Sequence, residues 1–246
     1  MLRNITLAFL QFVSAVIVFT NCEFKNSDGQ EQQSFEAFKS DVTVNKIKEQ
    51  AQAVVRQVLY DTAQWTRITD LDSTIVEDMR YATADNFVEE IMYDCAACYL
   101  RPEAAKAVVQ AHQMLRKQGY GGLKMFDCYR PRPIQQKLWD KVPDARYVTP
   151  PSKGSMHNRG LAVDLTIIDA LGNQLDMGTR FDYFGVEGYH TYDGHSAAIQ
   201  ANRKLLKETL QQVGFRHIRT EWWHYSYRKV SYPISDWQWD CPRVVE

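Results

Sequence analysis

The sequence predicts an α+β fold, built as one domain over residues 61–246. Helical and strand-like segments are mixed without the regular alternation that a doubly wound sheet requires. Hydrophobic residues make up 45% and charged residues 24% of the 246 residues, a balance typical of a globular protein. The sequence shows no repeated period, no low-complexity tract and no second segment long enough to form its own core.

Helices are predicted where apolar residues recur at three- and four-residue spacings, the pattern of an amphipathic helix. The clearest case begins with Pro102 and ends before Gly119, the order that helix ends favour, because proline lacks an N–H and glycine tolerates the left-handed conformation. The predicted helices span residues 44–59, 102–118, 133–141 and 196–213.

Strands are predicted where short apolar runs are bounded by turn residues. These runs are residues 123–129, 161–168 and 215–227, and the last fits either one or two strands. The second run contains a carboxylate, Asp164, among residues that are mostly apolar.

The first 21 residues predict a secretory signal peptide. Arg3 gives a positive start, and residues 5–20 carry no charge. This run is shorter than the roughly 18 to 20 residues that a bilayer-spanning helix needs. A buried N-terminal helix is the alternative, which the absence of a polar face disfavours.

Cys22 directly follows this apolar run and resembles the acylated cysteine of a bacterial lipoprotein signal, although Asn21 departs from the small residue usual at that position. Acylation would anchor the chain to a membrane. Residues 22–60 would then form a polar tether and the helix over 44–59. We therefore expect an exported, periplasmic or cell-envelope protein whose membrane contact is a lipid anchor at Cys22.

Four further cysteines, Cys95, Cys98, Cys128 and Cys241, suit disulfide formation in an exported protein. Four cysteines allow three complete pairings, and the sequence does not choose between them. The spacing of Cys95 and Cys98 also fits a zinc knuckle. No second Cys-x-x-Cys pair follows, so structural or free thiols are favoured.

The net charge disfavours a nucleic-acid partner. Lys and Arg number 29 and Asp and Glu number 30, which gives a formal charge of -1. A protein that grips a phosphate backbone normally carries a basic excess. The sequence does not specify an oligomeric state.

The segment over residues 155–166 predicts a metal site. Burying an unpaired Asp164 carboxylate would cost several kcal/mol, which a divalent cation offsets. His157 lies seven residues earlier, before the turn-forming Gly160, and can reach back to the same ion. A structural histidine and an Asp–Arg pair are the simpler alternatives.

The Glu-Trp-Trp-His segment from Glu221 to His224 strengthens this hypothesis. A catalytic zinc takes three protein ligands and leaves one position for water, and His157, Asp164 and His224 provide such a set. Glu221 then remains as a candidate general base. Residues three apart point to opposite faces of a regular strand, so Glu221 and His224 require a bulge or turn between them. Alternatively, the two tryptophans are core and Glu221 is a surface charge.

The pattern S-x-H-x-x-G-x-A-x-D, followed later by E-x-W-H, is complete in this chain. It is formed by Ser155, His157, Gly160, Ala162, Asp164, Glu221, Trp223 and His224. The pattern resembles the signature of the zinc D-alanyl-D-alanine dipeptidases, the vancomycin-resistance enzymes and their relatives, which share a fold with some D,D-carboxypeptidases and the hedgehog signalling domain. Residues 79–87, 127–131 and 176–182 resemble further motifs of this family.

The resemblance implies one zinc ion per chain, bound by His157, Asp164 and His224. It implies that Glu221 activates water and passes the proton to the leaving amine. Arg130 would stabilise the oxyanion, a role that suits a permanently charged fork of donors. A structural salt bridge is the alternative for Arg130.

Two residues would contact the substrate on this resemblance. Asp182 matches the position that holds the free ammonium of a dipeptide, and Ser155 matches a nearby polar contact. Asp176 and Asp193 lie close to Asp182 in sequence and are rival candidates. A buried acidic anchor excludes longer peptides, because their uncharged amide nitrogen would leave the anion unpaired.

The resemblance thus implies a central, mostly antiparallel sheet flanked by helices and zinc-dependent hydrolysis of D-Ala-D-Ala. The resemblance to the resistance enzymes implies a role in glycopeptide resistance. Those enzymes are cytosolic, however, and the export signal of this chain points to cell-wall turnover as a second possible role. Two alternatives remain. One is an exported D,D- or L,D-carboxypeptidase that trims peptidoglycan stems, and the other is a non-catalytic lipoprotein that binds wall peptides.

Overall fold

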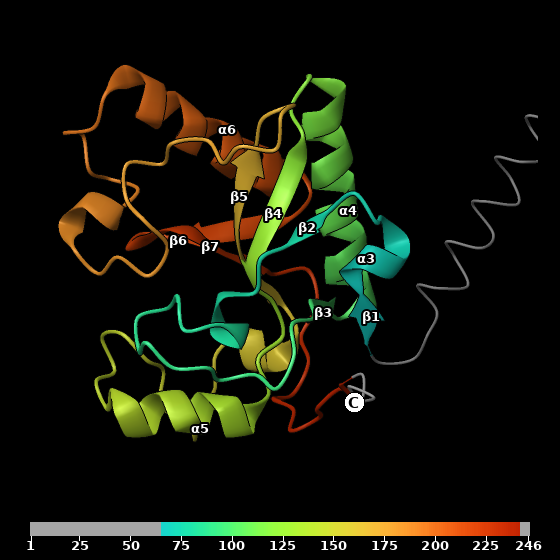
Figure 1. Ribbon diagram of the computed structural model, residues 1–246, viewed down its shortest axis with the longest axis vertical. Helices are drawn as coiled ribbons and strands as arrows, with labels where there is room; N and C mark the ends of the chain where they lie inside the picture. Colours follow the sequence, from blue (N-terminus) through green and yellow to red (C-terminus); the bar gives the residue numbers. More distant parts are fainter. Residues whose placement is uncertain (1–64, 242–246) are drawn as a thin grey trace, which may run out of the picture. The chain divides into compact units, whose positions relative to one another are not determined.

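The computed structural model describes residues 65–241. The predicted signal peptide, Cys22, the tether and the helix over 44–59 lie outside the described residues. Figure 1 shows the elements in the order β1 (Thr66–Arg67), α3 (Ile68–Leu71), β2 (Val76–Glu77), η1 (Arg80–Ala82), β3 (Tyr99–Leu100), α4 (Pro102–Lys117), β4 (Gly122–Asp127), α5 (Arg132–Lys141), η2 (His157–Arg159), β5 (Ala162–Ile168), η3 (Val186–Gly188), α6 (Ala197–Gln212), β6 (Phe215–Ile218) and β7 (Glu221–Tyr227).

A five-stranded sheet with the order β2-β4-β5-β7-β6 forms the centre of the domain (Figure 1). β2 pairs in parallel with β4, and all other neighbours in this sheet are antiparallel. β1 and β3 form a separate two-stranded antiparallel sheet. The α+β class and the mostly antiparallel sheet predicted from the sequence are confirmed, and residues 215–227 form two strands.

Helices α4 and α6 contact each other and pack on the sheet, α4 against β4 and α6 against β6. The predicted apolar stripe of α4 is buried at Ala104, Val108, Ala111 and Leu115. In Figure 1, α5 lies apart from this pair, beyond one end of the sheet. That end of the sheet, where β4 leads into α5, carries the polar residues described below.

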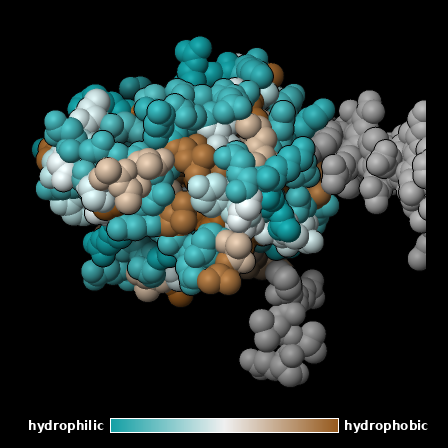
Figure 2. Space-filling model, turned by 90° about the horizontal axis from the view of Figure 1, so that it is seen from above, coloured by the Kyte–Doolittle hydropathy of each residue, from teal (hydrophilic) through white to brown (hydrophobic). Residues whose placement is uncertain are grey.

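The central strand β5 is buried at all seven residues, which explains why its sequence is mostly apolar. Trp222 and Trp223 of β7 are also core residues, with 0% and 1% exposure. Hydrophilic residues cover most of the face seen in Figure 2, where apolar residues show mainly around a central hollow. Between residues 65 and 241, no helix has the length and apolar character needed to cross a membrane.

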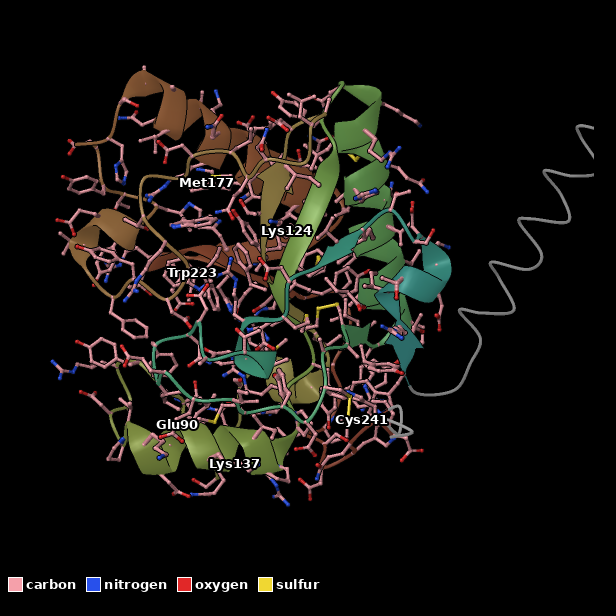
Figure 3. All side chains as sticks on the ribbon, viewed as in Figure 1. Glu90, Lys124, Lys137, Met177, Trp223 and Cys241 are labelled. Atoms are coloured by element: carbon pink, nitrogen blue, oxygen red, sulfur yellow. A yellow bond between two sulfur atoms is a disulfide. The ribbon has the colours of Figure 1, made fainter. Side chains whose placement is uncertain are left out.

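Two disulfides join distant segments (Figure 3). Cys95 pairs with Cys241, and Cys98 pairs with Cys128. The zinc-knuckle alternative for Cys95 and Cys98 is therefore wrong, because each sulfur is bonded to a different partner. The second disulfide ties the segment before β3 to the residue that follows β4.

Candidate active site

Asp164 and His224 lie directly opposite each other on the antiparallel strands β5 and β7. Side chains in such cross-strand pairs are close neighbours on one face of a sheet. His224 Nδ1 is 3.0 Å from Asp164 Oδ1, and Asp164 is only 3% exposed. The register of the sheet thus brings together two of the three predicted ligands.

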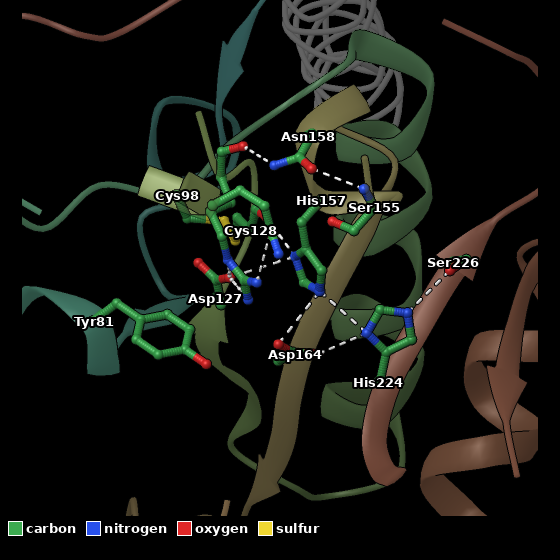
Figure 4. A network of polar contacts seen from close by, with 12 residues as sticks. Tyr81, Cys98, Asp127, Cys128, Ser155, His157, Asn158, Asp164, His224 and Ser226 are labelled. Carbon is green, nitrogen blue, oxygen red and sulfur yellow. Dashed lines mark hydrogen bonds and ion pairs between the residues drawn. A yellow bond between two sulfur atoms is a disulfide. The ribbon is translucent and has the colours of Figure 1, made fainter. Parts of the chain in front are cut away.

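His157 reaches the same point from the short helix η2. Gly160 ends η2 in the left-handed conformation, with φ of 68°, and turns the chain into β5. A Cβ atom at Gly160 would lie 2.4 Å from a ring carbon of Trp65, so any other residue would require the ring to move. His157 Nε2 lies 3.3 Å from Asp164 Oδ2 and 3.1 Å from His224 Nδ1 (Figure 4).

The outer nitrogen of each imidazole has its own partner. His157 Nδ1 lies 2.6 Å from the carbonyl oxygen of Cys128, which only accepts, so Nδ1 carries the proton and Nε2 presents its lone pair. His224 Nε2 lies 3.1 Å from Ser226 Oγ, and donation to that hydroxyl leaves Nδ1 as the inward lone pair. Two nitrogen lone pairs and a carboxylate therefore converge on one point.

This arrangement of ligand atoms fits a cation with tetrahedral coordination. Ligand atoms at about 2.0 to 2.1 Å from zinc in a tetrahedral site lie about 3.3 Å from one another. His157 Nε2 and His224 Nδ1 are 3.1 Å apart, and Asp164 lies 3.0 Å from His224 through Oδ1 and 3.3 Å from His157 through Oδ2. Burial opposes ionisation of Asp164, but His157 and His224 hold its pKa well below its usual range when their inward nitrogens carry protons. A cation at the same point would replace these protons and stabilise the same carboxylate. His157, Asp164 and His224 can hold a metal ion.

A bulge places Glu221 on the same side as His224. Along β6 and β7, His217 pairs with Tyr225, but the next pair is Ile218 with Glu221. The three residues of β7 between these pairs form a bulge. The sequence predicted a bulge or turn between Glu221 and His224, and this prediction is confirmed. Glu221 Oε2 lies 3.9 Å from His224 Nδ1. Burial raises the pKa of Glu221 to about 7, which suits proton exchange near neutral pH.

Arg130 follows the end of β4 and is held by Asp127. Asp127 Oδ2 accepts hydrogen bonds from Arg130 Nε at 3.0 Å and Nη2 at 2.7 Å. Gln135 Oε1 accepts a third from Nη1 at 3.1 Å. Burial opposes the charged guanidinium, but Asp127 raises the pKa of Arg130 well above its ordinary value. The guanidinium is thus both a salt-bridge partner and a fixed positive charge in the site.

Asp182 is buried, with 8% exposure, and Tyr81 donates its hydroxyl to Asp182 Oδ2 at 3.0 Å. Its backbone has φ of 57°, a strained left-handed conformation for a residue other than glycine. Burial, with the negative charge of Asp164, raises the pKa of Asp182 well above its ordinary value. The rival candidates Asp176 and Asp193 are exposed.

Ser155 has a buried hydroxyl oxygen for which the described residues supply no hydrogen-bond partner. Its backbone N–H donates to Asn158 Oδ1 at 2.7 Å, and Asn158 Nδ2 donates to the carbonyl oxygen of Arg130 at 2.7 Å. Asn158 itself is fully buried. Ser155 is therefore fixed in place with a free hydroxyl.

All seven predicted residues of the site line one cavity of about 620 Å³. They are Arg130, Ser155, His157, Asp164, Asp182, Glu221 and His224.

Four further residues support this site, although their sequence context predicts no role for them: Asp127, Tyr81, Gln135 and Asn158. The sequence does contain a signal for Asp127. It is a lone carboxylate at the end of a mostly apolar strand, just as Asp164 is a lone carboxylate within one.

A buried pair of imidazoles and a carboxylate, with a second carboxylate and a guanidinium beside them, defines a metal-dependent hydrolase. Comparisons with known proteins give the same class. The family model described as D-ala-D-ala dipeptidase matches residues 61–239. The chain belongs to this family and is a metallopeptidase.

Two curated relatives and one solved structure illustrate the likeness. The chain is 34% identical over 182 residues to D-alanyl-D-alanine dipeptidase of Escherichia coli (strain K12), covering 74% of this chain and 94% of that protein. It is 32% identical over 180 residues to D-alanyl-D-alanine dipeptidase of Enterococcus faecium, covering 64% and 88%. The structure of VanYB in complex with D-Alanine-D-Alanine is 19% identical, covers 53% of this chain and 72% of that chain, and has a TM-score of 0.35.

Proposed function

We propose that the protein hydrolyses the free dipeptide D-Ala-D-Ala, using one zinc ion per chain at His157, Asp164 and His224. The observation that carries this proposal is a single cavity that combines the three candidate metal ligands, Glu221 and the buried carboxyl group of Asp182. Relatives named for this dipeptide in Escherichia coli and Enterococcus faecium support the D-configuration of the substrate.

Zinc bound at this set would act as a Lewis acid that polarises the scissile carbonyl group and lowers the pKa of water. Glu221 would take a proton from the attacking water. It then gives that proton to the amine nitrogen as the carbon–nitrogen bond breaks. Its raised pKa of about 7 lets it perform both transfers near neutral pH.

Arg130 would stabilise the negative charge that develops on the carbonyl oxygen. A guanidinium has five N–H donors. Two bind Asp127 and one binds Gln135. One N–H on Nη1 and one on Nη2 therefore remain for the substrate, and their positions are fixed before the reaction begins.

Asp182 and Tyr81 form the candidate site for the substrate ammonium. Burial and the negative charge of Asp164 raise the pKa of Asp182, and an ammonium group bound beside it would stabilise it as an anion. A blocked or extended N-terminus offers a neutral amide and leaves this anion uncompensated. The anchor therefore favours a dipeptidase over a carboxypeptidase that accepts longer stems.

We also propose that the protein is exported and lipid-anchored at Cys22. Export places it where D-Ala-D-Ala is released during cell-wall turnover, and a part in glycopeptide resistance is the second candidate role. Two disulfides within residues 65–241 support an oxidising compartment. Labelling with a radioactive fatty acid tests the anchor. The wild-type protein should incorporate the labelled fatty acid and the Cys22→Ala variant should not. Equal incorporation in both proteins would contradict the proposed lipid anchor.

A substrate panel with metal analysis on the same sample tests the activity. We expect about one zinc per chain, hydrolysis of D-Ala-D-Ala, and little hydrolysis of its N-acetylated form. Glu221→Gln should keep the metal and lose activity. Preference for the acetylated substrate would favour the carboxypeptidase alternative. No turnover of any D-Ala peptide would favour the non-catalytic binding protein.

A further inference from the structure

Arg203 is a buried cation in the middle of α6, with 6% exposure. None of the ion pairs within residues 65–241 includes it. Its guanidinium instead donates to three backbone carbonyl oxygens, from Nε to Met177 at 2.7 Å, from Nη1 to Tyr189 at 3.1 Å and from Nη2 to Glu187 at 2.9 Å. Burial lowers the pKa of Arg203 to about 10, so it stays charged at neutral pH.

The three carbonyl groups belong to the two ends of one segment, residues 177–189, which lies between β5 and α6. Met177 lies beside α6 in Figure 3. Asp182, the candidate site for the substrate ammonium, lies five residues after Met177 and five residues before Glu187. One guanidinium on α6 therefore joins the two ends of the segment that carries Asp182.

The backbone of Asp182 requires such a constraint. Its φ of 57° lies in the left-handed region, which is unfavourable for a residue other than glycine and persists only where the surrounding structure enforces it. In this conformation Asp182 accepts the hydrogen bond from Tyr81 and lines the cavity. Trp222 Nε1 donates to Thr179 Oγ1 at 2.8 Å and holds the first half of the segment. Arg203 holds both ends.

We propose that Arg203 is a positioning residue for the substrate ammonium, because it fixes the segment that holds Asp182 in the cavity. Arg203 thereby sets the preference for a dipeptide with a free N-terminus. This inference rests on the proposed dipeptidase function and extends it to a residue of α6. Arg203 is not among the described residues that line the cavity, so it acts through Asp182 and not by contact with the substrate.

The substitution Arg203→Lys separates the charge from the arrangement of donors. Lysine keeps the positive charge and favours a helix. Its ammonium is a single point, however, and cannot reach three carbonyl groups that surround a planar guanidinium. We expect the amide hydrogens of residues 177–189 to exchange about 10-fold faster or more, with those of α4 unchanged. Wild-type exchange rates in this segment would contradict the proposed constraint.

Kinetics with two substrates test whether the constraint serves ammonium binding. The zinc-loaded protein is assayed with D-Ala-D-Ala and with its N-acetylated form, which lacks the ammonium. Arg203→Lys should raise KM for the free dipeptide about 10-fold, keep kcat within about threefold, and change kcat/KM for the acetylated form little. Wild-type KM and preference, or an equal loss for both substrates, would overturn the positioning role.

The matched control is Leu210→Ala, which truncates a fully buried side chain two turns further along α6. It should lower Tm through the cavity that it creates and leave the substrate preference unchanged. A purely structural role for Arg203 would give the same result in Arg203→Lys. Where Arg203→Lys does not fold, Arg203→Gln replaces it with the same expectation, because its neutral amide buries no charge.

Combining Arg203→Lys with Asp182→Asn tests whether the two residues act together. The double variant should have the kcat/KM of Asp182→Asn alone, within about twofold, because Arg203 acts through the Asp182 carboxylate. Losses that multiply independently would overturn the proposal. A wild-type protein that hydrolyses neither dipeptide would instead contradict the proposed function, and the role of Arg203 in it would fall as well.

Discussion

Replacing Asp127 with asparagine should destabilise the domain far more than the same change at Asp236. Both aspartates form two hydrogen bonds with an arginine, Asp127 with Arg130 and Asp236 with Arg132. The side chains of the first pair are 0% and 10% exposed, and those of the second are 56% and 46% exposed. The two pairs thus differ in burial, and Asp127 also lies 3.5 Å from His157 Nδ1.

Removing one partner of a buried ion pair costs about 3 to 5 kcal/mol, because the other charge stays buried without compensation. An exposed pair contributes about 0 to 1 kcal/mol. The bond from the Tyr93 hydroxyl to Asp127 Oδ1, at 2.7 Å, can be kept by the asparagine oxygen, so the lost charge dominates. For a domain of this size, the Asp127 change should lower Tm by roughly 6 to 20 °C.

Urea unfolding followed by tryptophan fluorescence measures both variants, with disulfides intact and with chelator present so that metal binding does not add stability. The free energy of unfolding should fall by about 3 to 5 kcal/mol for Asp127→Asn and by less than about 1 kcal/mol for Asp236→Asn. Equal losses would refute the view that Arg130 is a buried charge held by Asp127.

Three further predictions concern the proposed ammonium site at Asp182, metal binding and the turn before β5. Asp182→Asn should lower kcat/KM for D-Ala-D-Ala about 10- to 100-fold and change that for the N-acetylated dipeptide little; equal losses would argue against an ammonium site. Burial disfavours the charged form of His157, but Asp164 outweighs this and raises its pKa, so zinc affinity should fall as the pH drops through that raised value; calorimetry showing equal affinity at about pH 8 and about pH 5 would contradict it. Gly160→Ala should lower Tm more than Gly172→Ala. Both glycines have positive φ, but only at Gly160 would the added Cβ lie 2.4 Å from a ring carbon of Trp65. Similar decreases in Tm for the two variants would show that this contact with Trp65 does not matter.

Much of the fold could be predicted from local patterns. The apolar spacing and end residues of α4 place it within one residue of its observed span. The lone carboxylate of Asp164 in an apolar run indicated both the central strand and the candidate metal site, because burying such a group requires a compensating charge. The need for a bulge between Glu221 and His224 followed from strand geometry alone.

Other features depend on long-range pairing, which local sequence does not encode. Asp164 and His224 become neighbours only through the register of β5 and β7. The disulfide partners of Cys95 and Cys98 depend on how β3, β4 and the C-terminal segment pack. The role of Tyr81 needs the fold as well, because it contacts Asp182 across 101 residues of sequence.

The central claim is that one zinc ion binds at His157, Asp164 and His224. Anomalous X-ray scattering at the zinc absorption edge, from crystals of the zinc-loaded protein, tests it most directly. One anomalous peak is expected between His157 Nε2, His224 Nδ1 and the Asp164 carboxylate, and it should be lost in Asp164→Ala. No peak at this point, or a peak held by other residues, would contradict it.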